Sequence, residues 1–130
     1  MPAKTANPLR VLVVDDEVSI TDSLKEILRL RGHQAHAAYN GRSALESLSA
    51  STPQVLIADV FMDGMNGVEL ANHVADRIPG CRIILFSGQA DMIHTLAQSD
   101  LKSHRYTLYT KPIHPEVLLK LVEDPTSRVG

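Results

Sequence analysis

The stretch VLIAD, residues 55–59, places four apolar residues directly before a carboxylate. A short, continuous apolar run of this kind is typical of a β-strand that is buried on both faces. Residues 60–67, which follow it, include two glycines and an asparagine, a composition that indicates a loop. Asp59 is therefore expected at the carboxyl end of a central strand, where open parallel sheets form their ligand sites.

Strand-like and helix-like segments alternate along the chain. Short apolar runs predict strands at residues 10–14, 55–59 and 82–86. A weaker strand, nearer the edge of the sheet, is expected at residues 33–38, and a fifth strand at residues 105–109. Apolar residues at helical spacing predict helices at residues 18–31, in a short segment capped by Asn40, at 68–78, at 90–99, and from Pro115 to Pro125. This alternation favours an α/β fold, a doubly wound, five-stranded parallel sheet with helices on both faces and right-handed crossovers.

The composition is that of one ordinary globular domain. The 130 residues are 44% hydrophobic and 22% charged, with a formal net charge of -2. We expect a loose leader at residues 1–8, one domain at 9–124 and a short tail at 125–130. No apolar run approaches the roughly 18 residues that span a bilayer, and the slightly acidic charge does not favour a direct nucleic-acid partner. The single cysteine, Cys81, gives no disulfide framework and fits a reducing cytoplasm.

Polar side chains follow four of the predicted strands. Asp15 and Asp16 follow the first strand, Asp59 ends the third, Ser87 follows the fourth and Lys111 follows the fifth. Any one of these residues could simply begin a turn or cap a helix. In a parallel sheet, however, all the carboxyl ends lie at one edge, so the sequence predicts that the five side chains share one cleft.

The expected cleft suits metal and phosphate chemistry. Two carboxylates about 4 Å apart repel by roughly 4 kcal/mol at an effective dielectric near 20, so three of them require cations nearby. Lys111 offsets part of this repulsion, and Mg²⁺ suits a site with few carboxylates, waters and a phosphate oxygen. An Asp beside such an ion can attack phosphorus and form an aspartyl phosphate.

These residues, in this order, resemble the response-regulator receiver domains of two-component signalling, over roughly residues 10–122. In length and layout the chain is similar to single-domain chemotaxis regulators. The resemblance implies a flavodoxin-like (βα)5 fold with strand order 2-1-3-4-5. It also implies a phosphorylation-controlled regulator, cytoplasmic, that assists its own phosphorylation and dephosphorylation without being a turnover enzyme.

The resemblance implies roles for the acidic residues. Asp59 would accept a phosphoryl group from a histidine kinase or a histidine phosphotransfer protein. Asp16, Asp59 and the backbone carbonyl of Phe61 would bind Mg²⁺, with Mn²⁺ as an alternative, and Asp15 would act largely through a water. Lys111 would pair with the phosphate.

Further roles are carried over in the same way. The Ser87 hydroxyl would move to a phosphoryl oxygen, and Tyr109 would turn inward with Ser87 as an aromatic switch. Phe61 and Gln89 would tune the phosphoryl lifetime, and the Lys111–Pro112 peptide bond would be cis. The fourth helix, fifth strand and fifth helix would form the output face, through which two phosphorylated copies could pair.

One departure from the family pattern stands close to the predicted site. Asp63 occupies a position where the family usually has proline, and we expect its side chain at the surface. The six histidines show no metal-ligand spacing and are expected at the surface or at caps.

Other functions fit the residues less well. A haloacid-dehalogenase type of phosphohydrolase also uses an Asp nucleophile, but it needs a second acid two residues later, where this chain has Phe61. A flavodoxin-like cofactor binder would need a hydroxyl-rich or glycine-rich loop after the first strand, where the chain has three acids, residues 15–17. Two alternatives stay open: a receiver that no longer takes phosphate and acts as an interaction module, and a fragment of a larger regulator or hybrid kinase.

Overall fold

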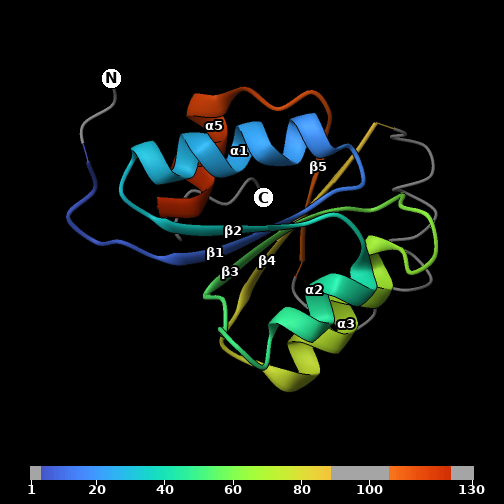
Figure 1. Cartoon of the computed structure of the whole chain (residues 1–130). Coiled ribbons are helices and arrows are strands. Elements are labelled where there is room, and N and C mark those ends of the chain that lie inside the picture. Colours follow the sequence, from blue (N-terminus) through green and yellow to red (C-terminus); the bar gives the residue numbers. More distant parts are fainter. Residues whose placement is uncertain (1–3, 89–105, 124–130) are drawn as a thin grey trace.

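The computed structural model describes residues 4–88 and 106–123. Five parallel strands form one sheet in the order β2-β1-β3-β4-β5 (Figure 1). The strands are β1 (Arg10–Val14), β2 (Gln34–Ala38), β3 (Val55–Asp59), β4 (Arg82–Ser87) and β5 (Tyr106–Thr110). The predicted fold class and strand order are confirmed. The observed bounds of β2, β4 and β5 differ from the predicted ones by one residue.

The helices cover both faces of the sheet. They are α1 (Val18–Leu30), α2 (Gly41–Ser47), α3 (Gly67–Arg77) and α5 (Pro115–Glu123). Helices α1 and α5 lie on one face, and α2 and α3 on the other (Figure 1). The helix predicted at residues 90–99 lies outside the described residues. None of the described helices has both the length and the apolar character to cross a membrane.

Each face of the sheet has its own apolar core, because β1, β3 and β4 carry buried side chains on both sides. Leu12, Leu56 and Leu85 point into the core beneath α2 and α3. Ile57 and Phe86 point into the core beneath α1 and α5. The continuous apolar runs in the sequence thus have the two-sided burial that they predicted.

The loop after β3 folds back closely over the end of that strand. Asn66 caps α3: its side chain accepts the Glu69 N–H at 2.9 Å, and the Glu69 carboxylate accepts the Asn66 N–H at 3.1 Å. This reciprocal arrangement fixes the first turn of the helix. The Gly67 N–H donates to the Val60 carbonyl at 2.8 Å. A Cβ atom on Gly67 would lie 2.1 Å from the Asp59 carbonyl oxygen, so only glycine fits there.

His33 is not at the surface, and that part of the expectation for the histidines is wrong. Its side chain is fully buried, with Nε2 2.8 Å from the Glu123 carboxylate. Nδ1 accepts the Leu9 N–H at 3.1 Å, so Nε2 carries the proton and donates to Glu123. Arg31 donates two further hydrogen bonds to Glu123, at 2.9 and 3.0 Å. This cluster joins the end of α1 to the end of α5.

Candidate functional site

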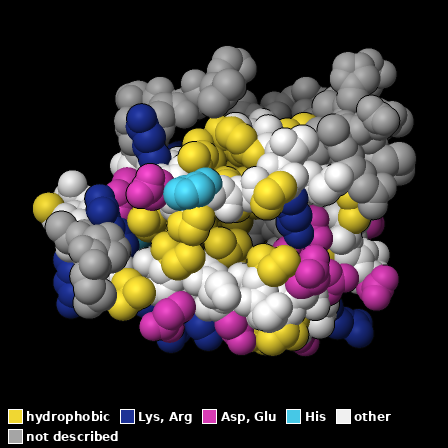
Figure 2. All heavy atoms as spheres, turned by 90° about the horizontal axis from the view of Figure 1, so that it is seen from above, with side chains coloured by type: hydrophobic (Ala, Val, Ile, Leu, Met, Phe, Trp, Pro, Cys, Tyr) yellow, Lys and Arg dark blue, Asp and Glu magenta, His cyan; other side chains and the backbone are white. Residues whose placement is uncertain are grey.

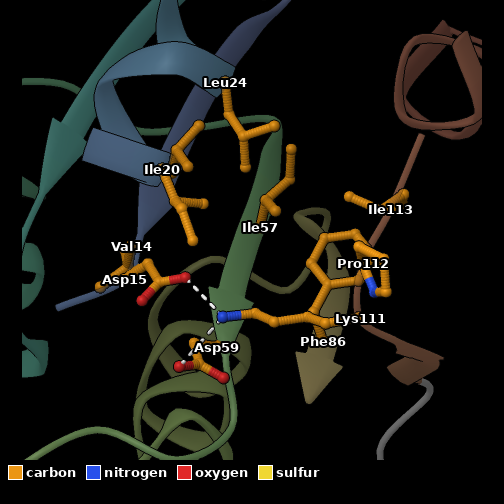
Figure 3. A pocket seen from close by; sticks show the side chains of 11 residues that line it. Val14, Asp15, Ile20, Leu24, Ile57, Asp59, Phe86, Lys111, Pro112 and Ile113 are labelled. Carbon is orange, nitrogen blue, oxygen red and sulfur yellow. Dashed lines mark hydrogen bonds and ion pairs between the residues drawn. The ribbon is translucent and has the colours of Figure 1, made fainter. Parts of the chain in front are cut away.

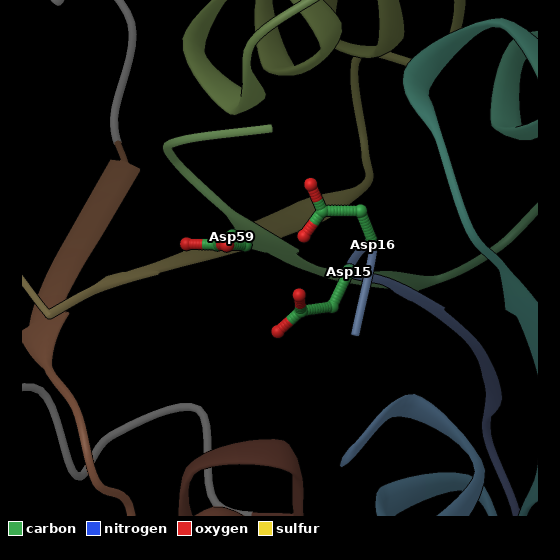
Figure 4. A group of neighbouring side chains, drawn as sticks. All are labelled: Asp15, Asp16 and Asp59. Carbon is green, nitrogen blue, oxygen red and sulfur yellow. The ribbon is translucent and has the colours of Figure 1, made fainter. Parts of the chain in front are cut away.

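Three carboxylates meet at the carboxyl edge of the sheet (Figure 4). Oxygens of Asp15, Asp16 and Asp59 all lie within 4.8 Å of one another. Asp15 is 3% exposed and Asp59 8% exposed, whereas Asp16 is open to solvent. The adjacent strands β1 and β3 bring them together, as the sequence predicted.

Lys111 reaches this cluster from the end of β5 (Figure 3). Its Nζ lies 2.7 Å from Asp15 Oδ2 and 3.4 Å from Asp59 Oδ2. Burial works against the charged ammonium, but the hydrogen bond to Asp15 and the charges of Asp59 and Asp15 outweigh it and raise the pKa of Lys111. Within residues 4–88 and 106–123, one ammonium against three carboxylates leaves two negative charges without compensation in this cluster.

Asp59 is held in a setting that disfavours its charge. Burial raises the pKa of Asp59 above its ordinary value; the charge of Lys111 works in the opposite direction and that of Asp15 adds to the increase. A divalent cation bound by oxygens would relieve both the burial and the repulsion, and this donor set suits Mg²⁺. The carboxylate geometry therefore fits the ion that the sequence predicts.

The loop after β3 lies against the carboxylates. The Phe61 N–H donates to Asp59 Oδ1 at 3.4 Å, and the Phe61 side chain is half-buried beside the core under α2 and α3. The Asp63 side chain is exposed, as expected, while its N–H lies 3.5 Å from Asp16 Oδ2. Both contacts are long for hydrogen bonds and are weak.

Ser87 is the last residue of β4 and is fully buried. Its carbonyl accepts the Lys111 N–H at 2.8 Å, which sets the end of β4 beside Lys111. Side chains alternate along a strand, so Ser87 shares a face with Ile83 and Leu85, on the side of α2 and α3.

Tyr109 lies on the other face of the sheet. It pairs with Phe86 in the register of β4 and β5, the ring centroids are 5.9 Å apart, and both rings belong to the core beneath α1 and α5. Its hydroxyl is buried and has no hydrogen-bond partner in the part of the chain that the structure describes. The structure therefore does not bring Tyr109 and Ser87 together, contrary to the expected paired switch. Leu108, which pairs with Leu85, lies on the same face as Ser87.

The sequence resemblance also predicts a cis peptide bond after Lys111 and a role for Gln89. The Lys111–Pro112 peptide bond is cis, as expected. Gln89 lies outside the described residues, so its suggested effect on phosphoryl lifetime stays a prediction.

The sequence reasoning missed Thr21, which supports the acidic loop. Its hydroxyl, fully buried in α1, lies 2.9 Å from the Asp15 carbonyl and 2.9 Å from the Glu17 carbonyl. The available signal was a threonine at helical spacing from Leu24 and Leu28, on the buried side of an amphipathic helix. Such a polar residue on an apolar stripe needs a partner, and here the partner is the backbone next to the site.

A family model described as the response regulator receiver domain matches residues 11–123. The chain belongs to this family. The receiver domain is 28% identical over 112 residues to the response regulator MprA of Mycolicibacterium vanbaalenii, covering 86% of this chain and 48% of that protein. It is 32% identical over 113 residues to the DNA-binding transcriptional regulator NtrC of Escherichia coli, covering 87% of this chain and 24% of that protein.

A solved structure also resembles this receiver domain. It is a receiver domain protein described as CheY-like from Methanospirillum hungatei, with a TM-score of 0.79 and 25% sequence identity. The similarity covers 92% of this chain and 94% of that one. The protein is thus a receiver domain of the kind that acts in two-component signalling, and it spans half or less of the two regulators compared with it.

Proposed function

We propose that Asp59 accepts a phosphoryl group from a phosphohistidine of a histidine kinase or of a histidine phosphotransfer protein. The observation that carries this proposal is the cluster of Asp15, Asp16 and Asp59 with Lys111 bridging two of them. An oxygen of Asp59 attacks the phosphorus, the bond from phosphorus to the imidazole nitrogen breaks, and its electron pair stays on that nitrogen. This transfer depends mainly on in-line positioning and on neutralising charge.

The carboxylates would hold the metal ion that this transfer needs. Asp16, Asp59 and the Phe61 carbonyl are the proposed direct ligands, and Asp15 acts largely through a water. Mg²⁺, or Mn²⁺ in its place, supplies positive charge for the phosphoryl oxygens. Lys111 exchanges its present partners for a phosphoryl oxygen, because the phosphoryl group adds negative charge next to its ammonium.

Ser87 is the proposed link between the phosphoryl group and the rest of the domain. Its hydroxyl moves to a phosphoryl oxygen, which alters packing on the side of α2 and α3. Tyr109 takes no part in this movement, because it packs on the opposite face. The proposed output face includes β5 and α5, and two phosphorylated copies pair there.

The receiver is proposed to work in the cytoplasm, as the single cysteine suggests, and to assist its own dephosphorylation without turning over a separate substrate. Its cognate partner would be a cytoplasmic histidine-containing domain, and no direct nucleic-acid contact is proposed.

The test is intact mass after incubation with Mg²⁺ and acetyl phosphate. We expect one added phosphoryl group on the wild-type chain, and none on Asp59→Asn or after chelation of the metal. Asp63→Asn is the matched control, because it removes an exposed carboxylate from the same loop and should still be labelled. Labelling of Asp59→Asn to the wild-type extent would overturn the proposal. Absence of labelling in the wild type with Mg²⁺ shown to bind would favour a phosphate-independent interaction module.

A further inference from the structure

A pocket of about 410 Å³ opens beside the carboxylates, between α1 and the segment that leads from β5 into α5 (Figure 3). Apolar side chains form most of its surface: Val13, Val14, Ile20, Leu24, Ile57, Phe86, Pro112 and Ile113. Its polar groups are Asp15, Asp59 and Lys111, which lie together at one end. The pocket is thus apolar along its walls and charged where it meets the proposed phosphoacceptor.

The size and lining of this pocket are those of a small-molecule site. Such sites have volumes of roughly 300–1,000 Å³ and apolar walls with a few convergent polar groups. Apolar side chains also gather on the outer surface of the same side of the molecule (Figure 2). Ile20 is 36% exposed there, so the α1 wall of the pocket is accessible from solvent.

The position of Asp59 determines which part of a phosphodonor would enter the pocket. In an in-line displacement the leaving group lies on the far side of the phosphorus from the attacking oxygen. In Figure 3, the Lys111 ammonium lies between the carboxylates of Asp15 and Asp59, at the charged end of the pocket. The apolar walls formed by Leu24 and Ile113 lie farther away. A leaving group that departs with negative charge would therefore meet this ammonium, while an apolar body attached to it would contact the walls.

We propose that this pocket binds the leaving group of a small acyl phosphate whose acyl part carries an aromatic or branched apolar body. The inference rests on the proposed function of Asp59. An oxygen of Asp59 forms a bond to phosphorus, and the bond from phosphorus to the acyl oxygen breaks. Both electrons of that bond leave with the oxygen, so the product is a carboxylate anion, and no proton, oxidant or further reactant is required.

The kinetic test compares benzoyl phosphate with acetyl phosphate, both with Mg²⁺ and with intact mass as the readout. Ile113→Trp fills the pocket, and Val117→Trp is the matched control because Val117 is 47% exposed on α5 and outside the pocket. The ratio of the benzoyl rate to the acetyl rate should fall by about tenfold in Ile113→Trp, as when a buried ring loses its contacts. It should be unchanged in Val117→Trp. Comparing ratios between proteins cancels the intrinsic reactivity of the two donors.

A second variant and a binding measurement make the test independent of phosphoryl transfer. Leu24→Gln makes the α1 wall polar and should lower the same ratio, whether or not Ile113→Trp folds. Benzylphosphonate cannot transfer its phosphoryl group and should bind the Mg²⁺-loaded protein about tenfold more tightly than methylphosphonate in an NMR titration. Leu24→Gln should reduce this preference.

The outcomes separate the two proposals. Equal affinities for the two phosphonates, or an unchanged donor ratio in Leu24→Gln, would overturn the pocket inference while leaving labelling by acetyl phosphate intact. Failure of both donors to label the wild type would instead contradict the role of Asp59, and the phosphonate titration would still decide whether the pocket binds an apolar group.

Discussion

Asp59 lies at the end of a strand that is buried along its whole length, beside two other carboxylates. Burial and the charge of Asp15 disfavour the ionised form of Asp59 and raise its pKa, and the charge of Lys111 offsets only part of this effect. A carboxyl group whose pKa is higher in the folded than in the unfolded chain favours folding while it is protonated. Its contribution to stability is lost as the pH rises through the window between the unfolded and the folded pKa.

The metal-free protein should therefore be stabilised by Asp59→Asn at neutral pH, with a melting temperature several degrees higher than the wild type. This advantage should shrink as the pH is lowered, because the wild-type Asp59 then becomes protonated in the folded state. Thermal unfolding over a pH series, with a chelator present, measures it. Asp63→Asn should show no such trend, and a pH-independent effect of Asp59→Asn would contradict the explanation.

The Phe61 side chain, two residues after Asp59, is half-buried beside the core under α2 and α3, and its ring has no hydrogen-bonding group. Replacing it by asparagine should shorten the phosphoryl lifetime several-fold, because an amide can orient a hydrolytic water that the aromatic ring excludes. The decay is measured by intact mass after the phosphodonor is removed. Phe61→Leu, which remains apolar, should change the lifetime less. An unchanged or longer lifetime in Phe61→Asn would count against the shielding role.

At the scale of single elements, the return of the chain from β3 into α3 depends on one close approach. Gly67 begins α3 directly against the Asp59 carbonyl, and the cap at Asn66 holds the helix in that place. The loop that carries the Phe61 carbonyl therefore has little freedom to move away from the carboxylates.

Gly67→Ala should destabilise the protein by about 3 kcal/mol, because its Cβ would overlap the backbone of Asp59 and neither segment can shift without breaking a cap or a strand. Urea unfolding followed by circular dichroism measures the loss. Gly80→Ala is the control, since a Cβ there meets nothing within 4 Å. Equal stability of the two variants would show that the loop moves freely.

The residues at which strands end were predictable from the sequence. Which side chains of two neighbouring strands share a face of the sheet was not. Asp59 was placed correctly because it directly follows an apolar run, and Lys111 because it follows the last predicted strand; parallel strands end at one edge. Tyr109 was paired wrongly with Ser87 because the face depends on the register, which sets Tyr109 opposite Phe86. A shift of one residue moves every side chain to the other face.

At the scale of the whole molecule, the contact of Glu123 with Arg31 and His33 joins the two helices on one face of the sheet. Arg82, at the start of β4, donates to the carbonyls of Leu121 and Val122 and so binds the same end of α5. No local pattern in the sequence indicates this cluster, since its members are as much as 92 residues apart. The pocket beside Asp59 was equally hidden, because it is a space between elements and not a property of any one of them.

Glu123→Gln should lower the free energy of unfolding by about 1–3 kcal/mol, because it removes the charge from a half-buried ion pair with Arg31. Glu46→Gln, on the exposed surface of α2, should change it by less than about 0.5 kcal/mol. Urea unfolding measures both. A loss no larger than in the control would mean that the charge of Glu123 contributes nothing to holding α5 against α1.

The contact between Lys111 and Asp15 joins residues that are 96 positions apart. During synthesis the three acids leave the ribosome well before the lysine that balances them, and β5 must then add to the edge of the sheet. Under the proposed role of Asp59, a nascent chain would therefore be unable to take up a phosphoryl group productively until β5 is in place. The cell would receive a signal only from molecules whose translation and folding have both reached β5.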